Sequence, residues 1–254
     1  MLVAFAAVAM VLLGRWQYDK HVTRDAYNAT IAAGKITAPA PVEQVLTTTD
    51  PPPDPVLFRT VILKGHYDVA HQVLARSHPL GSSNGLWVLA PLRLDSGPLV
   101  WVVRGWMGAT GGARDVLPAP PLSSGPVTVT GRVFSEENDD APIRPADLPS
   151  GQVQRADPVP LSAELGVNGP LLRGVVSAIA EDPPATVAAG ASALLEVPPP
   201  DLQAGPYLGY AGQWYLFSGM AIAVYFVTAF NVGRGRRPFG GKLEDDDEVA
   251  LAAE

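Results

Sequence analysis

The chain has no cysteine, few charges and only four histidines among its 254 residues. The histidines are His21, His66, His71 and His78. The lack of cysteine excludes a disulfide framework, thiolate metal sites, iron–sulfur clusters and thiol catalysis. Charged residues make up 17% of the chain and leave a formal net charge of -7. Because an acidic chain without a basic stripe does not neutralise phosphates, we expect no nucleic acid as a partner.

The sequence also offers little catalytic chemistry. We expect no nucleophile elbow, no P-loop and no dinucleotide-binding fingerprint. Asp139 and Asp140 lie in a stretch of loop composition and resemble solvent-exposed acids more than a catalytic pair. His66 and His71 flank a predicted turn at Gly65, and on one strand they would face opposite ways. We therefore predict a protein that is not an enzyme and has no metal site.

The most pronounced apolar segment covers residues 207–230, which carry no formal charge. As a helix at about 1.5 Å per residue it spans roughly 36 Å, more than a hydrocarbon core of about 30 Å. Trp214 and Tyr215 lie towards one end, and Tyr225 and Phe230 towards the other, as interfacial aromatic residues often do. These features predict a transmembrane helix.

A second apolar segment, residues 2–13, lies at the N-terminal end. Taken alone, it has the composition of a signal-peptide core. No basic stretch precedes it, however, and no A-x-A pattern follows it before Arg15. We therefore predict a first transmembrane helix over 1–15. We expect either that its true start precedes Met1, or that the helix is short and Trp16 anchors its outer end.

Basic residues set the expected orientation in the cell inner membrane. They follow the second apolar segment as Arg234, Arg236, Arg237 and Lys242, whereas residues 174–206 contain no Lys or Arg. By the positive-inside rule, both termini lie in the cytoplasm and the long loop outside. Arg15, Lys20 and Arg24 oppose this arrangement, but long loops translocate largely regardless of charge. The acidic run at 244–248 reads as a solvated tail.

The region between the helices reads as many short strands, since Gly and Pro number 25 and 26. The expected strands are 60–63, 72–76, 85–92, 99–103, 127–134 and 174–179, with a short helix at 160–165. Residues 99–103 are apolar on both faces and so predict a central strand. Asp95-Ser96-Gly97 predicts a hairpin turn. Ahead of the strands, we expect a helical extension that ends at Gly34.

The predicted fold class is therefore an α+β membrane protein, with two transmembrane helices flanking an antiparallel, β-rich, barrel-like extracytoplasmic domain. The expected parts are the first helix at 1–15, a helical extension and Pro-rich linker at 16–57, the β-rich domain at 58–200, the second helix at 207–230, and a basic-then-acidic cytoplasmic tail at 231–254.

Two Trp-containing pairs are open to two interpretations. The Arg104 guanidinium, after the most apolar strand, is suited to a partner's carboxylates or to haem propionates. Alternatively, Arg104 caps strand carbonyls and Trp106 packs at the mouth of the predicted barrel. Similarly, Trp16 is suited to anchoring at the membrane interface, and Gln17 to a hydrogen bond with a neighbouring helix.

The order of several short motifs resembles a known family. The motifs are Leu13-Gly14-x-Trp16-Gln17, Gly65-x-Tyr67-Asp68 followed by Gln72-Val73-Leu74-x-Arg76, Gly85-x-x-Val88-x-x-Pro91-Leu92, Val102-Val103-Arg104-Gly105-Trp106, and Tyr210-Ala211-x-Gln213-Trp214-Tyr215. Each is short, but together they resemble the surfeit locus protein 1 family, the assembly factors of haem-copper cytochrome c oxidase. The resemblance extends from the first helix to about Phe230.

This resemblance implies a factor that binds the catalytic subunit of the oxidase and assists haem a insertion or stabilises that subunit. Many members carry a histidine just before the second helix that is linked to haem; Tyr207 stands at the matching position here. Arg104 and Tyr207 are thus weak candidates for transient haem a contact, and no intrinsic cofactor is expected. Candidate contacts with membrane or partner are Trp16, Gln17, Arg104, Trp106, Tyr210, Gln213 and Trp214.

Two other functions remain open from the sequence. One is a structural accessory subunit of a respiratory supercomplex. The other is a two-pass extracytoplasmic sensor or receptor, although the short C-terminal tail carries no recognisable output module.

Overall fold

The computed structural model describes residues 2–109, 115, 117–118, 120–137, 142–185, 193–200 and 202–234. The chain divides into two compact units, Met1–Ala26 with Gln203–Glu254, and Tyr27–Leu202. Several residues singled out from the sequence lie outside the described ones: Asp139, Asp140, Arg236, Arg237, Lys242 and the acidic run at 244–248.

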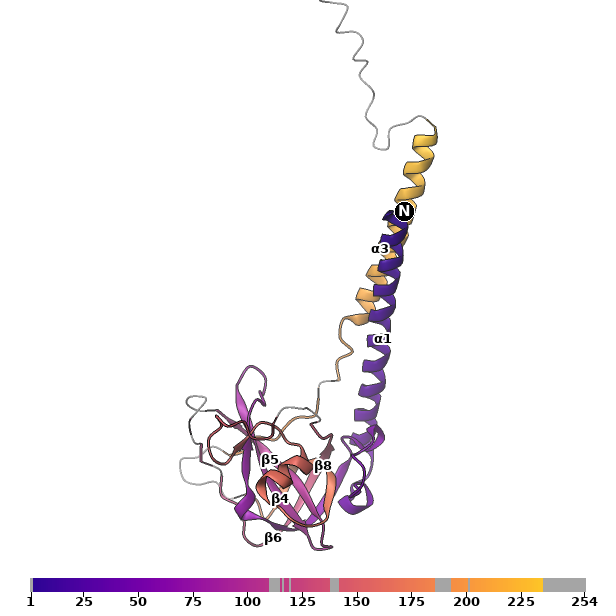
Figure 1. Cartoon of the computed structure of the whole chain (residues 1–254). Coiled ribbons are helices and arrows are strands. Elements are labelled where there is room, and N and C mark those ends of the chain that lie inside the picture. The colour runs from indigo at the N-terminus through magenta and orange to yellow at the C-terminus, as the bar shows by residue number, and fades with distance from the viewer. Residues whose placement is uncertain are drawn as a thin grey trace, which may run out of the picture. The chain divides into compact units, whose positions relative to one another are not determined.

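Two long helices form the first unit, and Figure 1 shows them side by side: α1 (Leu2–Ile36), of which the part up to Ala26 belongs here, and α3 (Tyr207–Gly233). Both are long and apolar enough to cross a membrane. Only 11% of the most apolar window of α1 and 6% of that of α3 is buried. Because the core helix of a soluble domain is largely buried, these exposed apolar surfaces need another apolar environment.

The two helices pack antiparallel. Ser218 donates a hydrogen bond to the carbonyl oxygen of Ala7 at 3.1 Å, and the ring of Tyr215 fills the space beside Gly14. The less exposed positions recur every three or four residues, as in a coiled-coil seam. They include Val3, Ala7, Met10, Gly14, Gln17, His21 and Arg24 on α1, and Tyr207, Ala211, Trp214, Ser218 and Ala221 on α3.

The C-terminal part of α1 belongs to the second unit. Ile31 is fully buried there, and the helix continues to Ile36, two residues past the end predicted at Gly34. A Cβ at position 34 would lie 2.8 Å from the carbonyl oxygen of Leu57. Gly34 therefore allows close packing of α1 against the following chain and does not terminate the helix.

The second unit is built on one eight-stranded sheet. Its strands are β1 (Ala40–Pro41), β2 (Thr60–Tyr67), β3 (Val73–Ala75), β4 (Gly85–Leu94), β5 (Leu99–Gly108), β6 (Pro126–Phe134), β7 (Gln152–Val153) and β8 (Leu171–Asp182). Their order is β1-β2-β6-β8-β5-β4-β3-β7, and β2 also pairs with β4. Strands β2, β6, β8, β5 and β4 therefore form a ring in which each pairs with its two neighbours, and the hydrogen bonding closes on itself; β1 and β3 pair in addition with β2 and β4.

The sheet is mixed, so the prediction of an antiparallel sheet was wrong. Pairs β1–β2, β3–β7 and β5–β8 are parallel. The connection from β5 to β8 includes β6, β7 and the helix α2 (Pro158–Leu165). A connection of that length returns the chain in the same direction, which a pattern of short strands does not reveal.

Gly65 lies within β2, not at the turn predicted there. A Cβ on Gly65 would lie 2.0 Å from the carbonyl oxygen of Arg93 on the paired strand β4. The glycine thus permits close approach of two backbones. The turn predicted at Asp95-Ser96-Gly97 is confirmed, since Leu94 and Gly97 are hydrogen bonded around it and β4 pairs antiparallel with β5.

Strand β5 lies centrally, as its sequence predicts: residues 100–103 are fully buried, with apolar clusters on both sides. Helix α2, which covers the predicted 160–165, packs against one side. Trp101 Nε1 donates to Ser162 Oγ at 2.9 Å, and Ser162 donates to the carbonyl of Pro158 at 2.7 Å.

Strand β5 also carries a bulge. Val103 and Gly105 face consecutive residues of β4, which leaves Arg104 without an opposite partner. A bulge of this kind shifts the alternation of side chains along a strand. As a result, Trp106 joins the apolar cluster of Trp101 and Val103, whereas the Arg104 side chain faces Tyr67 of the other cluster.

Candidate functional site

Arg104 is the centre of a buried polar network. Its Nε donates to Glu181 Oε1 at 3.1 Å and its Nη2 to Glu181 Oε2 at 3.2 Å. Its Nη1 donates to Gln72 Oε1 at 3.0 Å and to the carbonyl of Pro121 at 3.3 Å. The side chain of Arg104 is 1% exposed and that of Glu181 is 9% exposed. The guanidinium therefore has its carboxylate within the chain.

Tyr67 completes this network from β2. Its hydroxyl donates to Glu181 Oε1 at 2.6 Å, and its ring lies 5.4 Å from the Arg104 guanidinium carbon. Burial, followed by the Glu181 charge, raises the pKa of Tyr67 well above its usual value. The phenol accordingly stays protonated as a donor. Tyr67, Gln72 and Arg104, which come from three separate sequence motifs, thus meet in one network that joins β2, β5 and β8.

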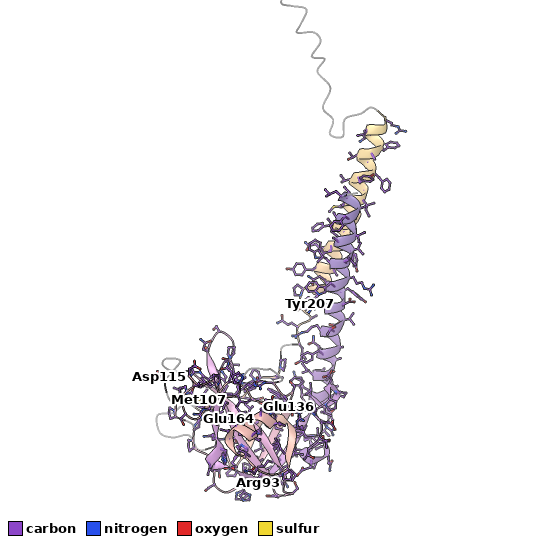
Figure 2. All side chains as sticks on the ribbon, in the orientation of Figure 1. Arg93, Met107, Asp115, Glu136, Glu164 and Tyr207 are labelled. Atoms are coloured by element: carbon purple, nitrogen blue, oxygen red, sulfur yellow. The ribbon has the colours of Figure 1, made fainter. Side chains whose placement is uncertain are left out.

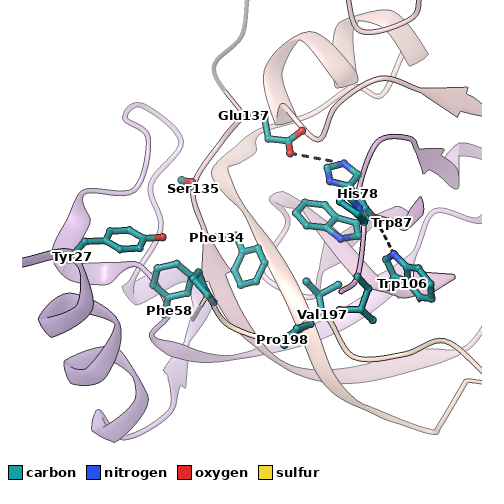
Figure 3. A pocket seen from close by; sticks show the side chains of 13 residues that line it. Tyr27, Phe58, His78, Trp87, Trp106, Phe134, Ser135, Glu137, Val197 and Pro198 are labelled. Atoms are coloured by element: carbon teal, nitrogen blue, oxygen red, sulfur yellow. Dashed lines mark hydrogen bonds and ion pairs between the residues drawn. The ribbon is translucent and has the colours of Figure 1, made fainter. Parts of the chain in front are cut away.

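A cavity of about 350 Å³ opens elsewhere in the second unit, here called the aromatic pocket. Figure 3 shows its side chains converging from α1, β4, β5, β6 and the connecting segments. It is lined by Tyr27, Phe58, His78, Pro79, Leu80, Trp87, Trp106, Phe134, Ser135, Glu137, Val197, Pro198 and Pro200. Five of these are aromatic Phe, Tyr or Trp residues, in a chain with 7% of such residues overall. Aromatic side chains are therefore enriched in the lining of the pocket.

His78 is the distinctive polar group of the aromatic pocket. Its imidazole stacks on the Trp87 indole with ring centroids 3.8 Å apart and an interplanar angle of 5°. Its side chain is 11% exposed, and its Nε2 is buried without a hydrogen-bond partner, 3.8 Å from Glu137 Oε1. Burial lowers the pKa of His78 to about 4, so the ring is neutral at pH 7.

Backbone strain is concentrated at the same place. Among the described residues, only Phe58 and Ser77 adopt a positive φ without being glycine, at 63° and 65°. Phe58 lines the aromatic pocket, and Ser77 directly precedes His78. Such conformations cost on the order of 1–3 kcal/mol each and tend to occur at ligand-binding sites.

Trp106 connects a sequence motif to this pocket. Its Nε1 donates to the carbonyl of His78 at 2.7 Å, and its indole occupies the space that a Cβ on Gly85 would need. Its main chain exchanges hydrogen bonds with Leu195. Trp106 is 7% exposed and therefore packs within the second unit, as one of the two sequence interpretations stated.

The sequence reasoning did not single out His78 as a site residue, nor Phe58, Trp87 or Phe134. These residues come from separate segments and share no local motif. The available signal was the number of aromatic residues bordering the predicted strands, which does not tell which rings meet.

Residues 81–85, Gly-Ser-Ser-Asn-Gly, do match the letters G-x-S-x-G, against our expectation that no nucleophile elbow pattern is present. A true nucleophile elbow places its serine between a strand and a helix. Here Ser83 and Leu80 exchange backbone hydrogen bonds of 3.1 and 2.9 Å in the connection between β3 and β4. The letters G-x-S-x-G therefore belong to a hairpin connection that leads into strand β4.

Each of the remaining histidines lies within 3.8 Å of one acidic side chain, His21 of Asp25, His66 of Asp95 and His71 of Asp68. His66 lies on β2, His71 ends the short helix η3 (Val69–His71) beside Asp68, and His21 lies on α1. His71 Nδ1 is 2.8 Å from Asp68 Oδ2, which makes a local turn contact. Over the described ranges, no three His, Asp or Glu side chains are grouped as a metal site would require.

The candidate residues of the helices fall into two groups. Trp16, Tyr210 and Gln213 are exposed, whereas Gln17, Trp214 and Tyr207 occupy positions of reduced exposure. Figure 2 shows Tyr207 at the start of α3, where its ring lies against Gly205. Trp214 contacts Phe217 edge to face with centroids 6.2 Å apart.

Three glycines of α3, at positions 209, 212 and 219, have nothing within 4 Å of a hypothetical Cβ. At about 100° per residue Gly209 lies roughly opposite Ala211 and Ser218, the α3 positions most buried against α1, whereas Gly212 and Gly219 lie about 90–110° to one side of them. This glycine face, defined by Gly209, Gly212 and Gly219, is therefore not covered by α1.

Comparison with known proteins agrees with the motif order. The SURF1 family matches residues 4–219. SURF1-like proteins of Mycobacterium bovis and of two Mycobacterium tuberculosis strains, all named as uncharacterised, are 30% identical over 250 residues, covering 98% of this chain and 89% of each relative. These matches confirm the resemblance drawn from the motifs. The chain belongs to the SURF1 family.

Proposed function

We propose that this protein is an assembly factor of haem-copper cytochrome c oxidase that binds the catalytic subunit of the oxidase within the membrane. Family membership supports the link to the oxidase. It acts by binding and has no catalytic role. The glycine face of α3 is the observation that carries the partner-binding part of the proposal.

Both helices cross the cell inner membrane, with both termini in the cytoplasm and the sheet outside. The exposed apolar surfaces of α1 and α3 support the crossing. Basic residues beginning with Arg234 at the end of α3, and the absence of Lys and Arg from 174–206, support the orientation.

The glycine face supplies the contact with the partner. In lipid, helices associate through small residues that let backbones approach closely. One neighbouring helix is already present on a different side of α3, where α1 packs at Ala211 and Ser218. The open space at Gly209, Gly212 and Gly219 admits a second helix, which belongs to the oxidase subunit.

The cargo of the assembly reaction, haem a, is not held by the two residues first considered. Arg104 is buried in an ion pair with Glu181, and Tyr207 replaces the histidine of other family members. A neutral tyrosine is a poor iron ligand compared with imidazole. The protein therefore stabilises the catalytic subunit during haem a insertion and does not provide an axial ligand.

Affinity purification in mild detergent tests this proposal. The wild-type chain is expected to co-purify with the oxidase catalytic subunit, and the double substitution Gly212→Leu with Gly219→Leu to lose most of that subunit. Ala229→Leu is the matched control, because Ala229 is an exposed small residue on the side of α3 away from the glycine face. A normal haem a content in a deletion strain would contradict the proposal.

The same experiment separates the other two functions. A fixed stoichiometry with the mature respiratory complex would identify an accessory subunit. Membrane insertion without any oxidase component in the purified fraction would favour a sensor or receptor.

A further inference from the structure

We propose that the aromatic pocket binds an uncharged one- or two-ring molecule whose ring carries a hydroxyl or carbonyl oxygen. This chemistry is shared by naphthols and by quinone or quinol head groups. The inference goes beyond the proposed role at the oxidase and does not depend on it, because the pocket lies within the second unit alone.

The size of the pocket sets the number of rings. Its volume of about 350 Å³ lies near the lower end of small-molecule sites, which run from about 300 to 1,000 Å³. A cavity of about 150 Å³ is enough for benzene, so this pocket has room for two fused rings. Phe58, Trp87 and Phe134 offer ring surfaces for stacked or edge-to-face contact with them.

The charge of the lining disfavours an anionic ligand. The described lining residues include no Lys or Arg, and they include the carboxylate of Glu137. An anion buried there would lack the cationic donors that carboxylates and phosphates need. This argument also disfavours haem, whose two propionates carry negative charge.

His78 supplies the recognition of oxygen. A neutral imidazole nitrogen either accepts a hydrogen bond from a hydroxyl or donates one to a carbonyl, depending on its tautomer. A buried nitrogen without a hydrogen bond destabilises the folded chain, and a ligand oxygen bonded to Nε2 would remove that penalty. The low pKa of His78 keeps the ring neutral across the physiological range.

Strain at Phe58 and Ser77 is an independent sign of the same site. Both residues adopt conformations that unconstrained side chains avoid, and they position the Phe58 ring and the His78 imidazole at the pocket. Strain of this kind persists where the arrangement of the site requires it.

Equilibrium dialysis of the purified full chain in detergent micelles tests the ligand class, with protein-free micelles correcting for partition. The probes are 2-naphthol, 2-methyl-1,4-naphthoquinone, naphthalene and 1-naphthoate. We expect both neutral oxygen-bearing probes to bind, naphthalene to bind about tenfold more weakly, and 1-naphthoate not to bind. Equal binding of naphthalene, or tight binding of 1-naphthoate, would overturn the proposal.

Substitution of His78 tests the assigned atom. His78→Phe keeps a ring stacked on Trp87 and removes the nitrogen, so it should weaken binding of the two oxygen-bearing probes about tenfold, leave the binding of naphthalene unchanged and not lower the melting temperature. His78→Gln, which retains a donor and an acceptor, should restore part of the affinity. His66→Phe is the control, because the His66 side chain is 56% exposed on β2. Unchanged binding of the oxygen-bearing probes in His78→Phe, or in His78→Leu where the Phe variant does not fold, would refute the assignment.

Two further comparisons separate the possible outcomes. Competition by a quinone with an isoprenoid tail would indicate a membrane-soluble ligand, whereas competition by 2-naphthol alone would indicate a water-soluble phenol. The glycine-face variants should bind the probes normally, and His78→Phe should still co-purify with the oxidase. The two proposals can therefore fail separately.

Discussion

The Arg104 network and the aromatic pocket both contain buried polar side chains that lie on β5 or next to it. They differ in the hydrogen bonds that these side chains make. The Arg104 guanidinium makes hydrogen bonds to Glu181, Gln72 and a main-chain carbonyl. Among the described residues, His78 Nε2 has no hydrogen-bond partner, and the Glu137 carboxylate lies 3.8 Å from it. The network is densely bonded, whereas the pocket combines an unpaired nitrogen, a cavity and backbone strain.

This difference indicates which buried polar group is available for binding a ligand. A buried ion pair with its full set of donors and acceptors supports the arrangement of the strands that it joins. A buried nitrogen beside a cavity has a hydrogen bond still to make. Arg104, which the sequence made a candidate for external carboxylates, thus belongs to the first class, and His78 to the second.

The largest effect expected from this comparison is at Glu181. Glu181→Ala leaves the Arg104 charge buried without its carboxylate, which should lower the free energy of unfolding by about 3–5 kcal/mol. Urea denaturation of the full chain in detergent, followed by circular dichroism, measures this. Glu196→Ala is the control, because the Glu196 side chain is 45% exposed beside Arg132 and its loss should cost at most about 1 kcal/mol. Equal losses in the two variants would remove the distinction between the network and an ordinary surface pair.

The second-largest effect should be a loss of stability in acid, caused by His78 in the aromatic pocket. The pKa of His78 is about 4 in the folded protein against 6.5 as the ordinary value, so the unfolded chain binds more protons between these values. The free energy of unfolding should therefore fall as the pH drops from about 6.5 to 4, by about 3 kcal/mol in total. Glu137, 3.8 Å from Nε2, is the acidic side chain facing the imidazole.

The difference between wild type and His78→Phe isolates this term, because the other titrating groups are common to both proteins. The two curves should be nearly parallel above pH 7 and diverge in acid. Parallel curves down to pH 4 would show that the imidazole is not held neutral by burial.

The smallest effect concerns the strain before His78. Ser77→Gly removes the steric cost of its positive φ and should raise the free energy of unfolding by up to about 1 kcal/mol. Ser82→Gly, in the exposed turn nearby, should give no gain, because Ser82 has no positive φ to relieve. A loss of stability at Ser77 comparable with that at Ser82 would argue against strain at the pocket.

Much of the fold was predictable because its signals are local. The apolar run at 207–230 is found within α3, and the strand predicted at 127–134 is found as β6 with alternating burial. The central position of β5 followed from its continuous apolar stretch. The roles of Gly34 and Gly65 as a helix end and a turn were predicted wrongly. Each glycine instead allows the close approach of a backbone segment distant in the sequence, at Leu57 and at Arg93 respectively.

The candidate site was much less predictable. The bulge at Arg104 depends on how β5 pairs with β4, and it directs Arg104 and Trp106 to opposite sides of the sheet although they are two residues apart. Period-two alternation alone would place them on one face. Likewise, nothing near His78 in the sequence indicates that it stacks on Trp87 or lies near Phe134.

Hydrophobic runs, turn residues and ordered short motifs were enough to predict the two apolar helices, the β-rich region between them and the family. The mixed strand order, the partner of Arg104 and the aromatic pocket became visible only in the folded chain. Side-chain burial and hydrogen bonding across a folded sheet depend on which distant segments meet, and no local pattern encodes that pairing.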